Sequence, residues 1–310
     1  MTALVCGSLA FDTVMVFPGR FRDHILADRI HMLNVSFLVP SMRRNFGGCA
    51  GNIAYNLRLL GEQGAPMGTV GHDFEPYRRW LKAIGVSLDY VRELDDAFTA
   101  QAFITTDLDD NQITAFHPGA MSQSHLNAVP VTAGITLGVV APDGRDGMLQ
   151  HAAQFAAAGI PWLFDPGQGL PMFDGADLRD LIDKATWVAV NDYEGQMLQE
   201  RTGWGPDEIA RKVRAYIVTK GADGSLIHVA GHRHEIPTVK PEVVTDPTGC
   251  GDAYRAGLIY GLMNELDWDT TGRIASLMGS IKIAHSGTQN HRLDMSEFKQ
   301  RFRAAFGREL

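Results

Sequence analysis

The strongest signal in this chain is the stretch Asp246-Pro-Thr-Gly-Cys-Gly-Asp252, and an apolar segment over residues 253–262 follows it directly. Its two glycines allow a tight turn, and the apolar segment predicts a helix that begins where the turn ends. The first N–H groups of a helix have no acceptor within the helix, and the helix dipole adds positive potential there. The stretch therefore predicts an anion hole suited to the charge on a transferring phosphoryl group.

Asp252 stands at the start of this predicted helix, where its carboxylate could accept the proton of an attacking hydroxyl. Phosphoryl transfer has a loose transition state, so the position of such a base matters more than its strength. The alternative is that Asp252 is only the N-cap of the helix, which is the commoner role of an isolated aspartate there. Its place within the whole heptapeptide favours the catalytic interpretation.

Outward from this stretch, the C-terminal two thirds of the chain alternates short apolar runs with amphipathic segments. The predicted strands cover residues 135–141, 161–164, 187–190, 213–219 and 225–229. The predicted helices cover residues 146–158, 177–185, 253–264, 270–285 and 296–306. Apolar strands between helices are typical of a largely parallel sheet that is covered on both faces. We therefore expect an α/β sandwich.

The N-terminal part of the chain shows a different pattern. Residues 13–45 have few helix starts and many Phe, Val and Leu residues, and the segments 100–106 and 112–116 alternate around a polar turn, which predicts a hairpin. We interpret 13–45 and 100–116 as one small β-sheet that forms a lid. The lid would be inserted into a large α/β domain made of residues 1–12, 46–99 and 117–310.

Composition excludes several classes of protein. The chain has 310 residues, of which 45% are hydrophobic and 21% charged, as in a soluble enzyme. A net charge of −8 without a basic stripe argues against nucleic-acid binding. No apolar run is long enough to cross a bilayer, no basic leader precedes the first strand, and three cysteines lack zinc-ligand spacing. We expect a cytoplasmic protein that binds neither nucleic acid nor membrane.

A second glycine pair, Gly47-Gly48, precedes a predicted helix over residues 50–60. Glycine lets the backbone approach a ligand closely, and Asn52 in the first turn can donate to or accept from a hydroxyl. Asp12 lies just beyond the first strand, where open α/β sheets place ligand contacts. An amide and a carboxylate that converge on vicinal hydroxyls predict a ribose site. The alternative is an aspartate in a turn and an asparagine that caps a helix.

Two further segments could bind a nucleotide. No Gly-x4-Gly-Lys-Ser/Thr motif occurs, so the chain is not a P-loop enzyme. In Asn191-Asp-Tyr-Glu194 the amide and the carboxylate are three residues apart after a strand, so they share one helical face. Thr219-Lys-Gly-Ala-Asp-Gly224 leads from a strand into a turn, and by itself it is most simply a hairpin turn.

A nucleobase needs a flat apolar surface. Phe103 and Phe116 lie on the two arms of the predicted hairpin and could share one face. Stacking on them would favour a purine by about 1–3 kcal/mol, the scale of base–aromatic contacts. Plain packing is the alternative for two phenylalanines in a hairpin.

The heptapeptide resembles the C-terminal signature of the ribokinase-like, phosphofructokinase B type sugar and nucleoside kinases, and Phe46-Gly-Gly-Cys-Ala-Gly-Asn52 resembles their N-terminal one. The resemblance covers the whole chain. It is closest to bacterial adenosine kinases and related nucleoside kinases, through Gly7-Ser-Leu-Ala-Phe-Asp12, Phe17-Pro-Gly-Arg-Phe21, Ser36-Phe-Leu-Val39 and Phe116-His-Pro-Gly-Ala-Met121. It implies a three-layer sandwich with a β lid, and transfer of the γ-phosphate of Mg·ATP to the 5′-hydroxyl of adenosine, giving AMP and ADP.

The resemblance also implies a role for each matching residue. Asp252 would be the catalytic base, with an anion hole formed by Gly249, Cys250 and Gly251. The nucleoside would be bound by Ser8, Asp12, Ser36, Gly47, Gly48, Asn52, Phe103, Phe116 and Gln168. ATP would be bound by Asn191, Glu194, Thr219, Gly221 and Gly224. Glu194 would also hold Mg²⁺ through water, which magnesium commonly retains.

One departure bears on the substrate. Asp165-Pro-Gly-Gln-Gly169 resembles a base-contacting loop in which relatives carry a second glutamine in place of Gly169. Selectivity depends on paired polar groups, so a missing amide predicts relaxed discrimination. The alternatives are a broad nucleoside kinase acting on inosine, guanosine and cytidine, a sugar kinase that uses Arg43 and Arg44, and a non-catalytic nucleoside sensor. Dependence on a monovalent cation such as K⁺ and a homodimer through the lid stay open.

Overall fold

The computed structural model describes residues 1–25, 34–109, 111–131 and 134–310. A large sheet contains β1 (Thr2–Cys6), β4 (Gly64–Gly71), β5 (Val91–Leu94), β8 (Ile135–Val140), β9 (Trp162–Phe164), β10 (Trp187–Asn191), β11 (Ala215–Thr219), β12 (Ser225–Val229) and β13 (His232–Ile236). A small sheet contains β2 (Ala10–Val16), β3 (Ser41–Gly47), β6 (Ala100–Thr106) and β7 (Gln112–His117). The helices are α1 (Cys49–Leu59), α2 (Glu75–Ala83), α3 (Arg145–Ala158), α4 (Gly175–Lys184), α5 (Asp192–Thr202), α6 (Pro206–Lys212), α7 (Cys250–Met263), α8 (Trp268–Ile283) and α9 (Met295–Phe306).

The large sheet has the strand order β13-β12-β11-β10-β9-β8-β1-β4-β5. In this order the strands from β11 to β5 run parallel to one another, whereas β12 pairs antiparallel with both β11 and β13. Each predicted strand and helix of the C-terminal two thirds is present, with ends shifted by a few residues. The expected mostly parallel sheet is therefore confirmed.

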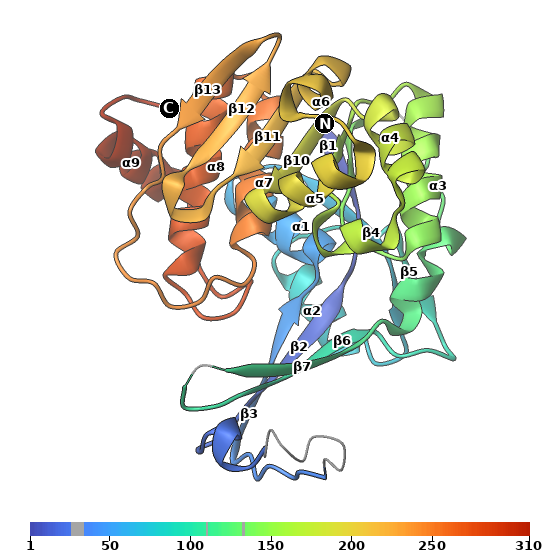
Figure 1. The fold of residues 1–310 in the computed structure, drawn as a ribbon, viewed down its shortest axis with the longest axis vertical. Helices are drawn as coiled ribbons and strands as arrows, with labels where there is room; N and C mark the ends of the chain where they lie inside the picture. The colour runs from blue at the N-terminus through green and yellow to red at the C-terminus, as the bar shows by residue number, and fades with distance from the viewer. Residues whose placement is uncertain (26–33, 110, 132–133) are drawn as a thin grey trace.

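Helices cover both faces of this sheet, which gives three layers (Figure 1). Along β10, Val188 and Val190 pack into a core with α3, α4, α5 and α6. Ala189, which lies between them, packs into the opposite core with α1, α7 and α8. Because neighbouring residues of a strand point to opposite faces, a strand buried on both sides must be apolar throughout. That requirement explains the continuous apolar runs in the sequence.

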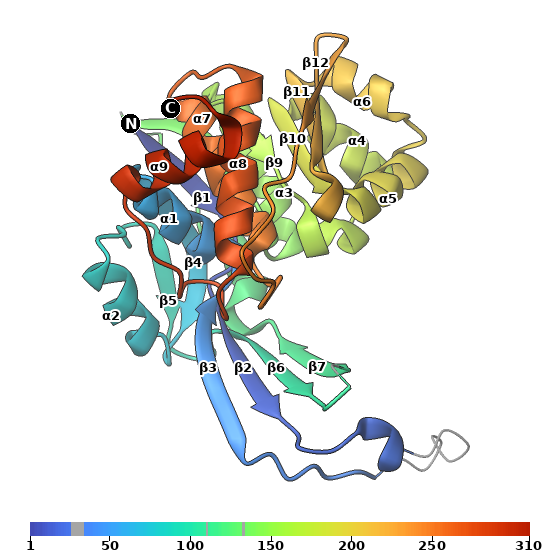
Figure 2. The same ribbon diagram turned by 90° about the vertical axis from the view of Figure 1, so that its left-hand side faces the viewer.

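The small sheet has the order β3-β2-β6-β7 and projects from one end of the large domain (Figure 2). β2 pairs antiparallel with β3 and parallel with β6, and β6 forms the predicted hairpin with β7. Its first strand begins at Ala10 and its second ends at Gly47, so the sheet extends beyond both ends of the predicted segment 13–45. Among the described residues, no helix is long and apolar enough to span a membrane.

Candidate active site

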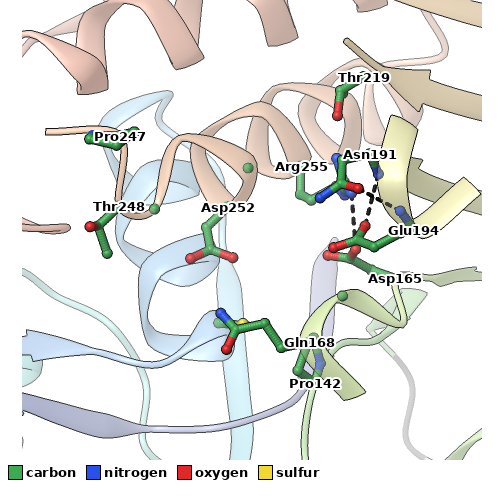
Figure 3. Close-up of a pocket in the computed structure, with 14 residues that line it drawn as sticks. Pro142, Asp165, Gln168, Asn191, Glu194, Thr219, Pro247, Thr248, Asp252 and Arg255 are labelled. Atoms are coloured by element: carbon green, nitrogen blue, oxygen red, sulfur yellow. Dashed lines mark hydrogen bonds and ion pairs between the residues drawn. The ribbon is translucent and has the colours of Figure 1, made fainter. Parts of the chain in front are cut away.

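A cavity of about 460 Å³ opens where the parallel strands end. It lies beside residues at or just after the carboxyl ends of β8, β9, β10 and β11 and beside the N-terminus of α7. This is the usual place for a ligand in an open α/β sheet. Figure 3 shows Asp252 and Gln168 on one side of the cavity and the polar side chains of Asp165, Asn191, Glu194 and Arg255 on the other. Its lining residues are Cys49, Pro142, Asp165, Gly167, Gln168, Asn191, Glu194, Thr219, Pro247, Thr248, Gly249, Gly251, Asp252 and Arg255.

Asp252 does not cap the helix. α7 begins at Cys250 and its N-cap is Gly249, which has a φ of 79°, a conformation that favours glycine. Asp252 lies in the first turn, and its carboxylate accepts a hydrogen bond from the side-chain amide of Asn52 at 2.8 Å. Burial raises the pKa of Asp252 to about 7, and the Asn52 bond opposes that rise. The carboxylate is therefore free to act as a base near neutral pH.

Asn52 is held in turn by buried groups. Its side-chain oxygen accepts from Nε2 of Gln289 at 3.0 Å, and Gln289 also donates to the hydroxyl of Tyr77. The Tyr77 hydroxyl donates to the carbonyl of Gly47 at 2.9 Å. The network ties α1 to α2 and to the segment after α8. Gln289 is 2% exposed and was not predicted, because no local pattern marks a partner 237 residues away.

The backbone before α7 differs in one respect from the expected anion hole. The N–H of Cys250 donates to the carbonyl of Pro247 at 3.1 Å, which closes a turn. Within the described part of the chain, the N–H groups of Gly249 and Gly251 have no acceptor, and both residues line the cavity. The N–H groups of Gly249 and Gly251 can therefore donate hydrogen bonds to an anion, whereas the N–H of Cys250 already donates to the carbonyl of Pro247.

The predicted nucleotide segment Asn191-Asp-Tyr-Glu194 is a capping box at the start of α5. The Asn191 side chain accepts from the N–H of Glu194 at 2.7 Å, and the Glu194 carboxylate accepts from the N–H of Asn191 at 2.8 Å. Both residues and Thr219 line the cavity, whereas Gly221 and Gly224 lie in the turn after β11 and are not among its lining residues.

The residues present fit a magnesium ion. Burial and the nearby charge of Asp165 raise the pKa of Glu194, so a cation beside this carboxylate would relieve both effects. No group of three or more His, Cys, Asp or Glu side chains in the described residues could hold a metal alone. Magnesium held by one or two carboxylates normally completes its shell with water and substrate phosphates.

A buried ion pair beside Glu194 was not predicted. Arg255 Nη2 lies 3.1 Å from Asp165 Oδ1, and both side chains are almost wholly buried (Figure 3). Arg255 follows Asp252 by three residues on α7, so both face the same side of the helix. Asp165 directly follows β9, at the carboxyl end of a parallel strand. The three-residue spacing from Asp252 and the place directly after a parallel strand are signals in the sequence from which Arg255 and Asp165 could have been predicted.

The predicted ribose residues lie close to one another, and Asn52 among them contacts Asp252. Asp12 lies beyond the first strand, as predicted, and it belongs to β2. A Cβ at Gly47 would collide with the Asp12 carboxylate, and Gly48 has a φ of 84° at the N-cap of α1. Ser8 Oγ accepts from the N–H of Cys49 at 3.1 Å. Burial, with a smaller effect of Asp246, raises the pKa of Asp12 to about 6.

The expectation that Phe103 and Phe116 share a face was wrong. Phe103 pairs with Ala115 and Phe116 pairs with Ala102, so the two rings point to opposite faces of the hairpin. Ala102 also pairs with Asp12, which places Phe116 on the Asp12 face. Phe103 belongs to the other face. The alternation of the sequence was right, but the cross-strand register decides which residues share a side.

The two remaining residues predicted to bind the base lie in different places. Gln168 lines the cavity, whereas Ser36 is exposed on the segment before β3 and is not among the lining residues. The neighbour of Ser36, Phe37, packs against Phe17 and Phe21, with ring centroids 4.8 and 5.0 Å apart. The structure therefore does not bring Ser36 to the cavity.

This chain is similar to known kinases. Residues 12–294 match the pfkB family of carbohydrate kinases. The chain is 54% identical to the Burkholderia thailandensis nucleoside kinase in the structure of its complex with inosine, with 99% of each chain covered and a TM-score of 0.90. It is 31% identical over 260 residues to a Methanocaldococcus jannaschii nucleoside kinase, covering 83% of this chain and 85% of that protein. The family match spans most of the sequence, so this chain is a kinase that belongs to the pfkB carbohydrate kinase family.

Proposed function

We propose that this chain is a nucleoside kinase that transfers the γ-phosphoryl group of ATP to the 5′-hydroxyl of a nucleoside. One observation carries the proposal: Asp252, whose pKa is about 7, lies in one cavity with the free N–H groups of Gly249 and Gly251. A base and an anion hole at one helix N-terminus are the two groups that this transfer needs.

Asp252 orients the 5′-hydroxyl and accepts its proton as the hydroxyl oxygen attacks the γ-phosphorus. The bond from that phosphorus to the bridging oxygen of ADP breaks in line with the attack. The N–H groups of Gly249 and Gly251 stabilise the charge that develops on the phosphoryl oxygens. The positive end of α7 acts in the same direction.

ATP lies at the end of the cavity formed by Asn191, Glu194 and Thr219, in agreement with their place in its lining. Glu194 would hold Mg²⁺ there, and the metal ion would neutralise phosphate charge. Arg255 and Asp165 keep the polar floor of this region in position through their buried ion pair. Gly221 and Gly224 provide the turn after β11 that approaches the nucleotide from outside the cavity.

The nucleoside lies between Asp252 and the small sheet. Asp12 and Asn52 hydrogen-bond to the ribose hydroxyls, and Gly47, Gly48 and Ser8 leave room for the sugar. Phe116 supplies the aromatic surface for the base, because it shares the Asp12 face. Closure of the lid over the ribose would exclude water and limit wasteful ATP hydrolysis.

For the base, we propose adenosine as one of several accepted substrates. The Burkholderia thailandensis kinase was solved in complexes with inosine and with ADP-inosine, and it is 54–55% identical to this chain. Gly169 has no side-chain amide with which to read a base edge. Both observations favour the broader of the two expectations, in which several nucleosides are phosphorylated.

The experiment is ADP release from Mg·ATP with adenosine, inosine, guanosine, cytidine, ribose and fructose 6-phosphate as acceptors. Turnover of several nucleosides is the expected result, and turnover of adenosine alone would restore the narrower function. Activity only on the two sugars would overturn the nucleoside assignment. Arg43, which lies on the Asp12 face of β3, would then be the candidate contact to a sugar phosphate. We also propose a cytoplasmic homodimer formed through the lid, which sedimentation analysis and localisation of a tagged chain would test.

A further inference from the structure

Lys282 is a fully buried lysine near the end of α8. Its ammonium donates to the carbonyl oxygen of Asp246 at 2.7 Å and to that of His285 at 3.2 Å. The Asp246 carboxylate Oδ1 lies 4.0 Å from the same ammonium. Lysine is almost never fully buried unless it is paired, so this place is organised around a positive charge.

The ammonium joins two segments beside the active site. Asp246 opens the loop that leads to Gly249 and α7, whereas His285 follows α8. The Asp246 carboxylate strengthens the junction, because it accepts the N–H of Thr248 at 2.9 Å and that of Gly287 at 2.8 Å. The position of the Gly249 amide therefore depends on contacts that converge on Lys282.

The chemistry of this place is that of a monovalent-cation site. Two backbone carbonyls and one carboxylate surround a single positive charge, and carbonyl oxygens are also the groups that replace the hydration shell of K⁺. The Lys282 ammonium already occupies the point on which these oxygens converge. A dissolved K⁺, which the sequence had left open as a cofactor, does not fit here.

The geometry also favours the charged form of the amine. Two of the three N–H donors of the ammonium reach backbone carbonyls, and the Asp246 carboxylate lies 4.0 Å away as an ion-pair partner. Burial lowers its pKa, while the charge of Asp246 acts against that effect. Loss of the proton would leave a buried carbonyl with a weaker partner, which is costly.

We propose that the Lys282 ammonium is a tethered monovalent cation, which holds the 246–252 loop in its anion-binding conformation and makes phosphoryl transfer independent of dissolved K⁺ or NH₄⁺. The inference rests on the kinase reaction proposed above. Lys282 acts through Asp246 and the loop amides, so it is a positioning residue. Its charge adds to the positive potential at the N-terminus of α7.

The test compares initial rates of ADP release in choline chloride, KCl and NH₄Cl at equal ionic strength. Three variants are assayed beside the natural chain: Lys282→Ala, Lys282→Met and, as a control, Lys299→Ala on the exposed side of α9. Alanine opens the space of the ammonium to a small cation. Methionine is neutral and fills most of that space, so it keeps the cation out. Circular dichroism and thermal unfolding show whether each variant is folded.

The natural chain and Lys299→Ala should be equally active in all three salts. Lys282→Ala should lose roughly 10²-fold in kcat in choline, the scale of one lost oxyanion donor, and regain activity with K⁺ or NH₄⁺. Lys282→Met should show the loss without the recovery.

Three results would overturn the proposal: a natural chain that needs K⁺, a Lys282→Ala variant that is fully active in choline, or a folded Lys282→Ala variant that no cation restores. The first needs no variant, so the proposal can fail even if both substitutions prevent folding. A natural chain that releases no ADP in any salt would instead refute the kinase function itself.

Discussion

The side-chain amide of Asn52 donates to the carboxylate of Asp252 at 2.8 Å, and this bond connects α1 to α7 across 200 residues of sequence. Residues beyond Asn52 determine which atom of its side-chain amide faces Asp252. The indole N–H of Trp80 donates to Oε1 of Gln289 at 2.9 Å, which leaves Nε2 of Gln289 to donate to Asn52. An indole can only donate, so every amide in the chain of bonds has one orientation. Asn52 must therefore present its NH₂ group to Asp252.

Replacing Asp252 by asparagine should remove catalysis without removing the fold. The Asp252→Asn side chain keeps its size but cannot accept the proton of the 5′-hydroxyl, so kcat should fall on the order of 10²–10⁴-fold. Steady-state ADP release measures this loss. Asp146→Asn, on the exposed first turn of α3, is the matched control and should keep full activity. An active Asp252→Asn enzyme would remove Asp252 from the role of base.

The pH dependence of kcat/KM should show the ionisation of Asp252. The pKa of this carboxyl is about 7, and only its ionised form can accept a proton. The value of kcat/KM should therefore rise with pH through about 7 and level off above it. Initial rates at low nucleoside concentration, in buffers of equal ionic strength, give the profile. A profile without an acid limb near neutrality would contradict this role.

Gln289→Met should weaken catalysis through Asn52, although Gln289 itself is not among the residues that we place against the nucleoside. Methionine has a similar length but no amide, so Asn52 is free to turn and its bond to Asp252 weakens. Because that bond lowers the pKa of Asp252, the acid limb of kcat/KM should move to higher pH. Trp80→Phe, which removes the indole donor and keeps an aromatic ring, should shift the limb less in the same direction. An unchanged limb in folded Gln289→Met would reduce Gln289 to a packing residue.

The two lid phenylalanines should differ in their effect on nucleoside binding. Phe116 shares the face of Asp12 and Phe103 lies on the opposite face. Phe116→Ala should raise KM for purine nucleosides by the equivalent of about 1–3 kcal/mol of lost stacking. Phe103→Ala, the matched control, should leave KM almost unchanged. Equal effects from both variants would mean that the base does not stack on the Asp12 face.

Asp143 should make the free energy of unfolding fall as pH rises. Burial raises its pKa from 3.8 to about 8 in the folded chain. Between these two values the folded state keeps a proton that the unfolded state has lost, so raising the pH favours unfolding. Asp143→Asn can keep the bond from the Gly144 N–H but cannot ionise, so its Tm should exceed that of the natural chain above pH 8.

Thermal unfolding from acid to alkaline pH measures this difference. The exposed Asp96→Asn change serves as the control and should leave the curve unaltered. A Tm difference between Asp143→Asn and the natural chain that does not grow with pH would contradict the assigned ionisation.

Most of the large domain could be predicted from local patterns. The apolar run at residues 187–190 was recognisable as a buried strand without knowledge of its partners, because burial on both faces leaves no place for polar residues. The turn before α7 could be predicted equally well, since the glycines at 249 and 251 and the apolar segment that forms the helix are within a few residues of one another. Asn191 and Glu194 form their capping box for the same reason, as neighbours on one helix.

Contacts between distant segments required the folded chain. Strand register placed Phe103 away from Asp12, and a turn bond consumed the amide of Cys250, although both residue types fitted the expected roles. Gln289 and Lys282 carry no local signal, because their partners Asn52 and Asp246 lie far from them in sequence. Secondary structure depends on interactions among near neighbours, so the sequence alone predicts it well. The orientation and charge of an active site depend on which remote groups meet, and only tertiary packing decides that.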